Sequence, residues 1–366
     1  MIPYGRQTID ENDIKRVVKT LRSPWLTQGP AVLEFEKLLA KAGGVKYAVA
    51  VSSGTAALHL AYLAVGLKKG DEVITTPNTF AATANMLLAV GAKPVFCDIR
   101  LDTYNIDERK VERLITKRTR ALAVVDFAGQ PAEMKEIYRI AKKHKLLLIE
   151  DASHSLGASY RGRSVGSLAD LTTLSFHPVK AIATGEGGAV LTNNKKLYET
   201  IKLLRSHGIF KDNRGKNVMV ALGFNYRMSD IQAALGTSQL EKLDKFIRLR
   251  NQASKWYEEE FVGLEHIILP QTLPHNYSAW HIYVIRVKYP KLRDKLWRYL
   301  VKKWIGANFH YPAVYTHPYY QKLGYGKKKF RNEELYSQSC ITLPLYPTLK
   351  RREVHFIASC LKEWFK

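Results

Sequence analysis

Residues 174–190 read LSFHPVKAIATGEGGAV, and this stretch holds one lysine in an unusually uncharged setting. A strand-like run ends at residues 175–177, and Lys180 follows with only small or apolar neighbours until Glu186. The chain carries 57 lysine and arginine residues, nearly all of them free to lie in water, so this one needs an explanation. A lysine after a strand is commonly a solvated loop residue, but apolar surroundings lower the pKa of a lysine amine and make it nucleophilic.

The stretch belongs to a long alternation of strand-like and helix-like segments that covers the first 250 residues. The strand-like runs are short and almost continuously apolar, which is typical of strands buried on both faces. They lie at 46–52, 72–76, 94–98, 121–127 and 146–151. The helix-like segments between them include 31–44, 55–67 and 133–144. Alternation of this kind predicts right-handed crossovers and an α/β fold with a mostly parallel sheet.

The pattern changes in the last third of the chain. Residues 229–261 read as one long helix, and a strand (280–287), a helix (291–304), a loop-rich stretch (309–321) and a closing helix follow. We therefore predict two domains. A large domain covers residues 1–245, with an N-terminal arm at 1–25, and a smaller α+β domain covers residues 246–366.

Composition and charge limit the class of protein. The 366 residues are 46% hydrophobic, which indicates a soluble globular chain with a large core. The first ten residues lack the apolar region of a signal peptide, and the apolar runs are too short to cross a bilayer. The three cysteines show no metal-binding or disulfide spacing. We therefore expect a cytoplasmic protein without a metal or a membrane partner.

The net charge of +24 has two interpretations. It could attract a polyanion such as nucleic acid or an anionic small molecule, or it could reflect a lysine-rich, solvated surface. The basic clusters at 142–145, 327–331 and 350–352 are spread along the chain, and no zinc finger, RNA-binding strand motif or helix-turn-helix accompanies them. We favour the solvated surface and expect no nucleic-acid partner.

Three polar groups follow predicted strands, where ligands bind in open α/β sheets. SSGTAA at 52–57 leads into a helix, whose N-terminal N–H groups attract phosphate, although an ordinary capped turn looks the same. Asp151 ends a strand and could either cap the next helix or pair with a cationic ligand atom. Together with Lys180, these groups are the parts that a pyridoxal 5'-phosphate enzyme needs. Its lysine forms a Schiff base with the cofactor, and its aspartate keeps the pyridine nitrogen protonated.

Several longer motifs resemble one family. They are SSGTAA (52–57), PNTFAATANMLL (77–88), EDASHSLGA (150–158), SFHPVKAIATGEGGAVLTN (175–193), RSHGIF (205–210), GFNYRMSDIQAALGTSQL (223–240) and HYPAVYTHPYY (310–320). In this order they resemble the DegT-type sugar-nucleotide aminotransferases over nearly the whole chain. The resemblance implies the fold-type I architecture of pyridoxal phosphate-dependent transferases, with a mostly parallel sheet flanked by helices and a smaller C-terminal α+β domain.

The resemblance also implies a role for each site residue. Lys180 would carry the cofactor, Asp151 would pair with its pyridine nitrogen, and His154 would lie near its 3-hydroxyl group. The remaining cofactor contacts would come from the phosphate-binding residues Gly54, Thr55, Ala56 and Ser175, from Phe80 stacked on the ring, and from Asn225 of a second subunit. The active unit would therefore be a homodimer. The nucleotide sugar would contact Tyr4, Trp25, Leu26, Thr27, His310 and Tyr311.

Within the family, SFHPVK followed by TGEGGAV looks most like the pseudaminic acid branch. That branch transfers an amino group from glutamate to C4 of a UDP-linked 4-keto-6-deoxy-N-acetylhexosamine. Relatives with histidine in place of the lysine dehydrate their substrate, and Lys180 argues against that outcome. Two alternatives stay open: amination of another keto sugar, at C3 or C4 and linked to dTDP or GDP, and a basic nucleic-acid-binding regulator. The regulator would need an added helix-turn-helix, and no segment is left to build one.

Overall fold

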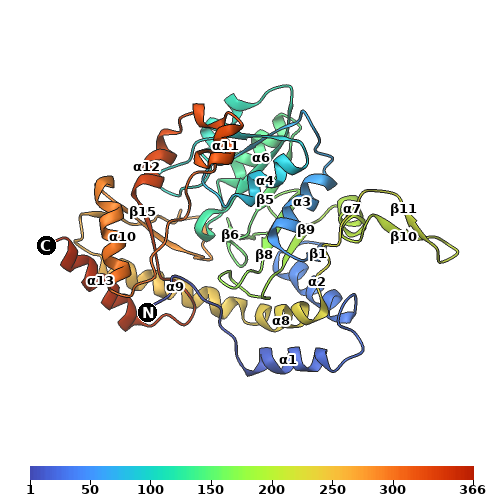
Figure 1. Cartoon of the computed structure of the whole chain (residues 1–366), viewed down its shortest axis with the longest axis horizontal. Coiled ribbons are helices and arrows are strands. Elements are labelled where there is room, and N and C mark those ends of the chain that lie inside the picture. Colours follow the sequence, from blue (N-terminus) through green and yellow to red (C-terminus); the bar gives the residue numbers. More distant parts are fainter.

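The computed structural model describes residues 1–366, and a seven-stranded sheet forms its centre (Figure 1). The strands lie in the order β1 (Tyr47–Val51), β9 (Gly188–Thr192), β8 (Leu171–Ser175), β5 (Leu147–Asp151), β4 (Thr119–Val125), β2 (Glu72–Thr75) and β3 (Lys93–Phe96). Only β9 runs antiparallel to its neighbours; the other adjacent strands pair in parallel. The predicted α/β fold with a mostly parallel sheet is confirmed.

Helices cover both faces of this sheet. One face packs against α2 (Pro30–Ala42), α6 (Met134–Lys143) and α8 (Asp230–Leu240). The other packs against α3 (Gly54–Ala64), α4 (Ala82–Ala89) and α7 (Lys195–Arg205). In β4, Leu122 and Val124 lie in the first core while Ala121 and Ala123 lie in the second. Burial of alternate residues on opposite faces explains why the strands are continuously apolar in sequence.

The C-terminal part builds a separate core around a three-stranded antiparallel sheet. The strands are β12 (Ile267–Ile268), β14 (Tyr283–Val287) and β15 (Cys340–Leu343). The helices of this part are α9 (Leu243–Glu260), α10 (Arg293–Lys302), α11 (Pro318–Lys322), α12 (Arg331–Ser339) and α13 (Arg351–Trp364). The other elements are α1 (Glu11–Leu21), α5 (Glu108–Val111), the hairpin β10 (Ile209–Lys211) and β11 (Asn217–Met219), and a small sheet of β6 (Ser159–Tyr160), β7 (Arg163–Ser164) and β13 (Asn276–Tyr277).

The N-terminal segment packs on the C-terminal part of the chain, where both ends of the chain lie (Figure 1). The Ile2 N–H donates to the Trp304 carbonyl at 2.9 Å, and the Leu345 N–H donates to the Tyr4 carbonyl at 3.0 Å. In the opposite direction, the Val314 N–H donates to the Pro77 carbonyl at 3.0 Å. The first residues of the chain therefore contact the C-terminal part, and residue 314 of the C-terminal part contacts the N-terminal part. The predicted domain boundary at residues 245–246 stays a prediction.

The predicted single helix over residues 229–261 is wrong, because two helices occupy this stretch. α8 ends at Leu240 and α9 begins at Leu243. The break lets α8 pack against α1 and α2 while α9 packs against α13 (Figure 1). The residues in the break, Glu241 and Lys242, include no glycine or proline, so tertiary packing rather than a local signal ends the helix.

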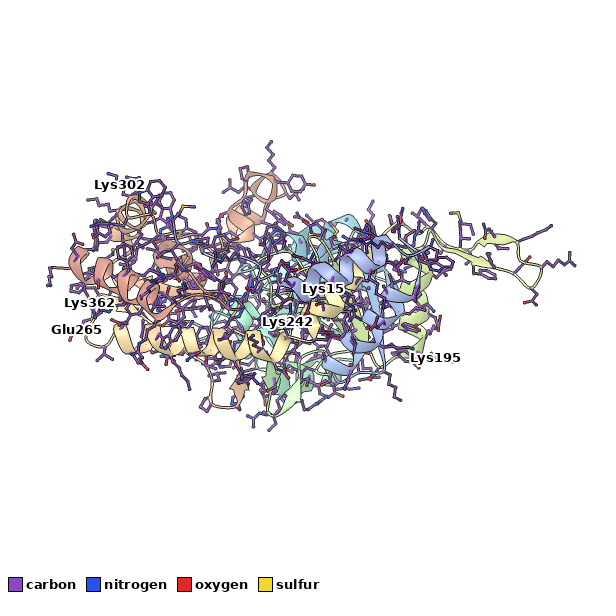
Figure 2. All side chains as sticks on the ribbon, turned by 90° about the horizontal axis from the view of Figure 1, so that it is seen from below. Lys15, Lys195, Lys242, Glu265, Lys302 and Lys362 are labelled. Carbon is purple, nitrogen blue, oxygen red and sulfur yellow. The ribbon has the colours of Figure 1, made fainter.

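Two surface features bear on partners. The β10–β11 hairpin projects from the body beside α7 and exposes Phe210 and Met219 (Figure 1). Of the lysines labelled in Figure 2, Lys15, Lys195, Lys302 and Lys362 lie on four different helices, and Lys195 lies well away from Lys302 and Lys362. None of the helices combines the length and the apolar character that crossing a membrane requires.

A buried ion pair fastens α1 to the start of α9. Asp13 is fully buried, and its Oδ2 lies 2.6 Å from the Lys242 Nζ and accepts the Gln239 side-chain amide at 2.8 Å. Asp13→Ala should lower the free energy of unfolding by about 3 kcal/mol, at the lower end for a broken buried ion pair because Lys242 keeps Asp10 as a partner at 2.9 Å.

Urea denaturation followed by circular dichroism measures this loss. Glu11→Ala is the matched control, since Glu11 is exposed in the first turn of the same helix and should cost less than ~1 kcal/mol. Equal effects of the two substitutions would show that the buried pair does not hold α1 in place.

Candidate active site

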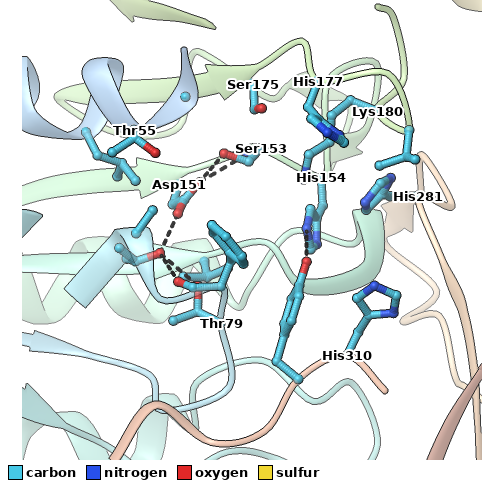
Figure 3. A pocket seen from close by; sticks show the side chains of 18 of the residues that line it. Thr55, Thr79, Asp151, Ser153, His154, Ser175, His177, Lys180, His281 and His310 are labelled. Atoms are coloured by element: carbon cyan, nitrogen blue, oxygen red, sulfur yellow. Dashed lines mark hydrogen bonds between the residues drawn. The ribbon is translucent and has the colours of Figure 1, made fainter. Parts of the chain in front are cut away.

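A cavity of about 510 Å³ opens where β5 and β8 end and α3 begins (Figure 3). Asp151 is the last residue of β5, and Ser175 is the last residue of β8. The turn after β8 adds Lys180, and the C-terminal part adds His281 and residues 308–311. The cavity is therefore built at the carboxyl edge of the sheet, as expected for an α/β fold.

The N-terminus of α3 forms one wall of the cavity. Ser53 caps the helix, and its hydroxyl accepts the Ala56 N–H at 3.1 Å. The N–H groups of Gly54 and Thr55 have no acceptor within the helix, because they belong to its first turn. A Cβ on Gly54 would lie 2.8 Å from the Ser175 Cβ, so only glycine fits this close approach. The wall offers free N–H donors to an anion.

Asp151 is a buried carboxylate held by hydroxyl groups. It is 5% exposed; Oδ1 accepts the Ser153 hydroxyl at 2.6 Å, and Oδ2 accepts the Thr83 hydroxyl at 2.7 Å (Figure 3). No lysine, arginine or histidine lies within ion-pair distance of it. A buried charge without a cationic partner is costly, so the site favours a cationic atom bound at this carboxylate.

Lys180 faces the same cavity. Burial lowers the pKa of its amine from 10.5 to about 8, and the charge of Asp151 opposes part of that change. Figure 3 shows Lys180, His154 and His281 on one side of the cavity and Thr55 on the other. A lysine with this pKa has far more unprotonated, nucleophilic amine near neutral pH than an exposed one.

Three neutral histidines surround this lysine. Burial lowers the pKa of His154 and His281 well below its ordinary value, and that of His310 to about 4. His154 Nε2 lies 3.1 Å from the Tyr311 hydroxyl, and the rings of His154 and His281 lie 4.2 Å apart. The Nδ1 atoms of His154 and His281 are buried without a hydrogen-bond partner. These atoms can bind a ligand without adding charge.

The structure brings most of the predicted site residues into this one cavity. Those that line it are Tyr4, Gly54, Thr55, Phe80, Asp151, His154, Ser175, Lys180, His310 and Tyr311. Those that do not are Ala56, Trp25, Leu26, Thr27 and Asn225. Ala56 is buried behind the wall, whereas the other four are exposed on this chain. The roles assigned to all of these residues stay predictions.

Several residues of the cavity were missed in the sequence, among them Ser153, Thr83 and His281. Thr83, which binds Asp151, lies in the PNTFAATANMLL motif, and its position one helical turn after Thr79 was a usable signal. His281 is the second residue of the mostly apolar strand-like run 280–287, and a histidine there could also have been noticed. No cluster of three or more histidine, cysteine or acidic side chains has the geometry of a metal site.

The Lys180 amine should titrate at a pH of about 8 in the protein without added aldehyde. Reductive ¹³C-methylation followed by an NMR pH titration measures this, and Lys180→Arg assigns the resonance by its disappearance. Asp151→Asn should lower the pKa further, because the carboxylate charge favours the ammonium form. Titration near the ordinary value of 10.5 would show that the amine lies in water.

Comparisons with known proteins agree on one family. The model of the DegT/DnrJ/EryC1/StrS aminotransferase family matches residues 7–362. A Campylobacter jejuni protein named UDP-4-amino-4,6-dideoxy-N-acetyl-beta-L-altrosamine transaminase is 42% identical, over 99% of this chain and 96% of its own length.

Solved structures agree with the sequence match. Helicobacter pylori PseC, described as an aminotransferase involved in the biosynthesis of pseudoaminic acid, superimposes with a TM-score of 0.96 at 36% identity, covering 100% of this chain and 99% of its own. A putative sugar aminotransferase of Streptococcus pneumoniae in its PMP-form superimposes with a TM-score of 0.95 at 29% identity, covering 99% of this chain and 98% of its own. The predicted fold-type I architecture and aminotransferase activity are confirmed, and the chain belongs to the DegT/DnrJ/EryC1/StrS aminotransferase family.

Proposed function

We propose that this aminotransferase uses pyridoxal 5'-phosphate to move an amino group from glutamate to C4 of a UDP-linked 4-keto-6-deoxy-N-acetylhexosamine. The observation that carries the chemistry is a single cavity in which a lysine of lowered pKa and a buried, hydroxyl-bound carboxylate both face the ligand space. The name of the 42% identical relative supports the choice of sugar.

The residues of the cavity fit the cofactor. The buried Asp151 carboxylate lacks a cation, and a protonated pyridine nitrogen supplies one. The unpartnered Nδ1 of His154 suits the 3-hydroxyl group, and the free N–H groups at the start of α3 suit the phosphate. Phe80 is 61% exposed beside the cavity and offers an uncovered ring for stacking. When bound, the cofactor supplies an electron sink for the carbon that loses a proton.

The side chains of this chain then do three things. Lys180 would hold the cofactor through its amine, and the same amine, when free, would act as general base and then general acid, taking a proton from the cofactor and giving it to C4 of the sugar. The Ser153 and Thr83 hydroxyls donate to the two oxygens of Asp151 and fix the orientation of the carboxylate, which would pair with the pyridine nitrogen and keep it protonated. The neutral His154 binds without adding a charge that would compete with this pairing.

The charge of the cavity supports a homodimer. Lys180 is its only lysine or arginine, yet a nucleotide sugar, glutamate and the cofactor phosphate all bring negative charge. Asn225 is exposed and away from the cavity of its own chain, as expected of a residue that completes the site of a second copy. We also propose that the enzyme works in the cytoplasm, where glutamate and nucleotide sugars are supplied.

A panel of substrates tests the proposed specificity. The enzyme with pyridoxal 5'-phosphate and glutamate should aminate the UDP-linked 4-keto-6-deoxy-N-acetyl sugar and release 2-oxoglutarate, with both products read by mass spectrometry and the aminated carbon by NMR. Lys180→Ala serves as the inactive control. Faster turnover of a dTDP- or GDP-linked sugar, or an amine at C3, would contradict the proposal.

Mixing two inactive variants tests the shared site. A heterodimer of Lys180→Ala and Asn225→Ala chains carries both lesions at one site and neither at the other, so about half of its sites should regain activity if a second subunit supplies Asn225. Native mass spectrometry verifies that subunits have exchanged. A mixture that stays inactive after exchange, or a fully active monomer, would show that one chain builds the site alone.

A further inference from the structure

Arg250 is a buried cation of α9 that binds backbone carbonyls from three separate segments. It is 1% exposed and takes part in no ion pair. Its Nη1 donates to the carbonyls of Trp280, His281 and Leu345 at 3.2, 3.0 and 3.1 Å. Its Nη2 donates to the carbonyls of Val179 and Lys180, both at 3.4 Å. One side chain therefore joins the turn of Lys180 to two segments of the C-terminal part.

An arginine is suited to this task and a lysine is not. A guanidinium group presents its N–H donors in a rigid plane, so the carbonyls that it binds are held at fixed positions relative to one another. Burial lowers the pKa of Arg250 to about 10, so the group still carries its charge near neutral pH. No carboxylate pairs with this buried charge, and only carbonyl dipoles compensate it. Burying such a charge costs free energy that an apolar side chain in the same place would not, so packing alone does not explain the arginine.

The His281 segment is held on its other side as well. The N–H groups of Ala279 and His281 donate to the carbonyls of Gly129 and Ala128 at 2.8 and 2.9 Å. A Cβ on Gly129, whose φ is +103°, would lie 2.6 Å from the Trp280 nitrogen. The segment is thus clamped between α9 and the turn after β4, and this clamp directs the His281 side chain into the cavity.

The third segment leads to another residue of the cavity. The Leu345 carbonyl accepts from Arg250, and the Leu345 N–H donates to the Tyr4 carbonyl at 3.0 Å. Tyr4 lines the cavity, and its ring lies 5.4 Å from that of His310. Three walls of the cavity therefore depend on contacts that converge on Arg250.

We propose that Arg250 is a positioning residue of the transamination: by fixing the carbonyls of Lys180 and His281 relative to each other, it sets where the Lys180 amine stands against the cofactor and the sugar. This inference rests on the proposed function of Lys180. A misplacement of about 1 Å at a reacting group can cost roughly 100-fold in rate, so loss of this clamp should affect chemistry more than substrate binding.

Four variants test the role. Arg250→Met keeps the length and the apolar stem but removes every donor, and Arg250→Lys keeps the charge but not the planar set of donors. Arg248→Met is the matched control, since Arg248 is exposed on the same helix. Asn251→Ala is a second control. The Asn251 side chain donates to the Ser278 carbonyl at 2.9 Å, so its removal loosens the segment of Ser278 but takes away no contact with Lys180.

The first readout is the rate at which pyridoxal 5'-phosphate, added to the cofactor-free protein, becomes bonded to Lys180, followed by the yellow absorbance and its loss on borohydride addition. Arg250→Met should slow this step by roughly 10-fold or more and lower kcat by roughly 10- to 100-fold, while KM for the nucleotide sugar stays within about 3-fold. The attachment rate and kcat of Arg250→Lys should lie between those of wild type and Arg250→Met. Both control variants should match wild type.

Thermal melting establishes that each variant is folded. A folded Arg250→Met protein that binds the cofactor at the wild-type rate, with only its melting temperature lowered, would overturn the proposal, because the residue would then be merely structural. If Arg250→Met does not fold, Arg250→Lys decides: attachment and kcat slowed relative to Arg248→Met support the proposal, and wild-type values overturn it. A wild-type protein that never bonds the cofactor at Lys180 refutes the proposed function itself, which is a different result.

Discussion

Burial of the Lys180 amine opposite the Asp151 carboxylate is the constraint on which the rest of the site depends. Burial disfavours the ammonium form, and Asp151 favours it, but burial prevails and brings the pKa from 10.5 to about 8. This lowering corresponds to roughly 3 kcal/mol against the charged amine. A fully paired lysine would be a poor nucleophile, and a lysine in water would be almost entirely protonated at neutral pH. The cavity holds the amine between these two conditions.

The fold supplies this setting through the direction of its strands. Because β5 and β8 run in parallel, Asp151 and Ser175 end at the same edge of the sheet, and the turn after β8 brings Lys180 to that edge. The C-terminal part then closes the cavity with His281, His310 and Tyr311. Four histidines line the cavity, and burial lowers the pKa of three of them, His154, His281 and His310, so these three add no charge beside the amine and the carboxylate. The fourth, His177, and a further acid, Glu186, are exposed.

Local signals in the sequence were sufficient for the strands of the sheet and for the motifs at their ends. Continuously apolar runs predict strands buried on both faces, and Asp151, Ser175 and Lys180 follow two such strands directly. Long-range packing was not visible. The break between α8 and α9 has no glycine or proline, and it exists because α8 packs on α1 while α9 packs on α13. Likewise, nothing near Ile2 indicates that it binds residue 304, and nothing near Arg250 indicates which carbonyls it reaches.

The most direct test of the account is to locate the covalent bond to the cofactor. Purified enzyme is loaded with pyridoxal 5'-phosphate, reduced with borohydride, digested and mapped by mass spectrometry. We expect a phosphopyridoxyl group on the peptide that contains Lys180 and on no other lysine of the chain. A modification at another lysine, or an unmodified Lys180 peptide from yellow enzyme that borohydride has bleached, would contradict it.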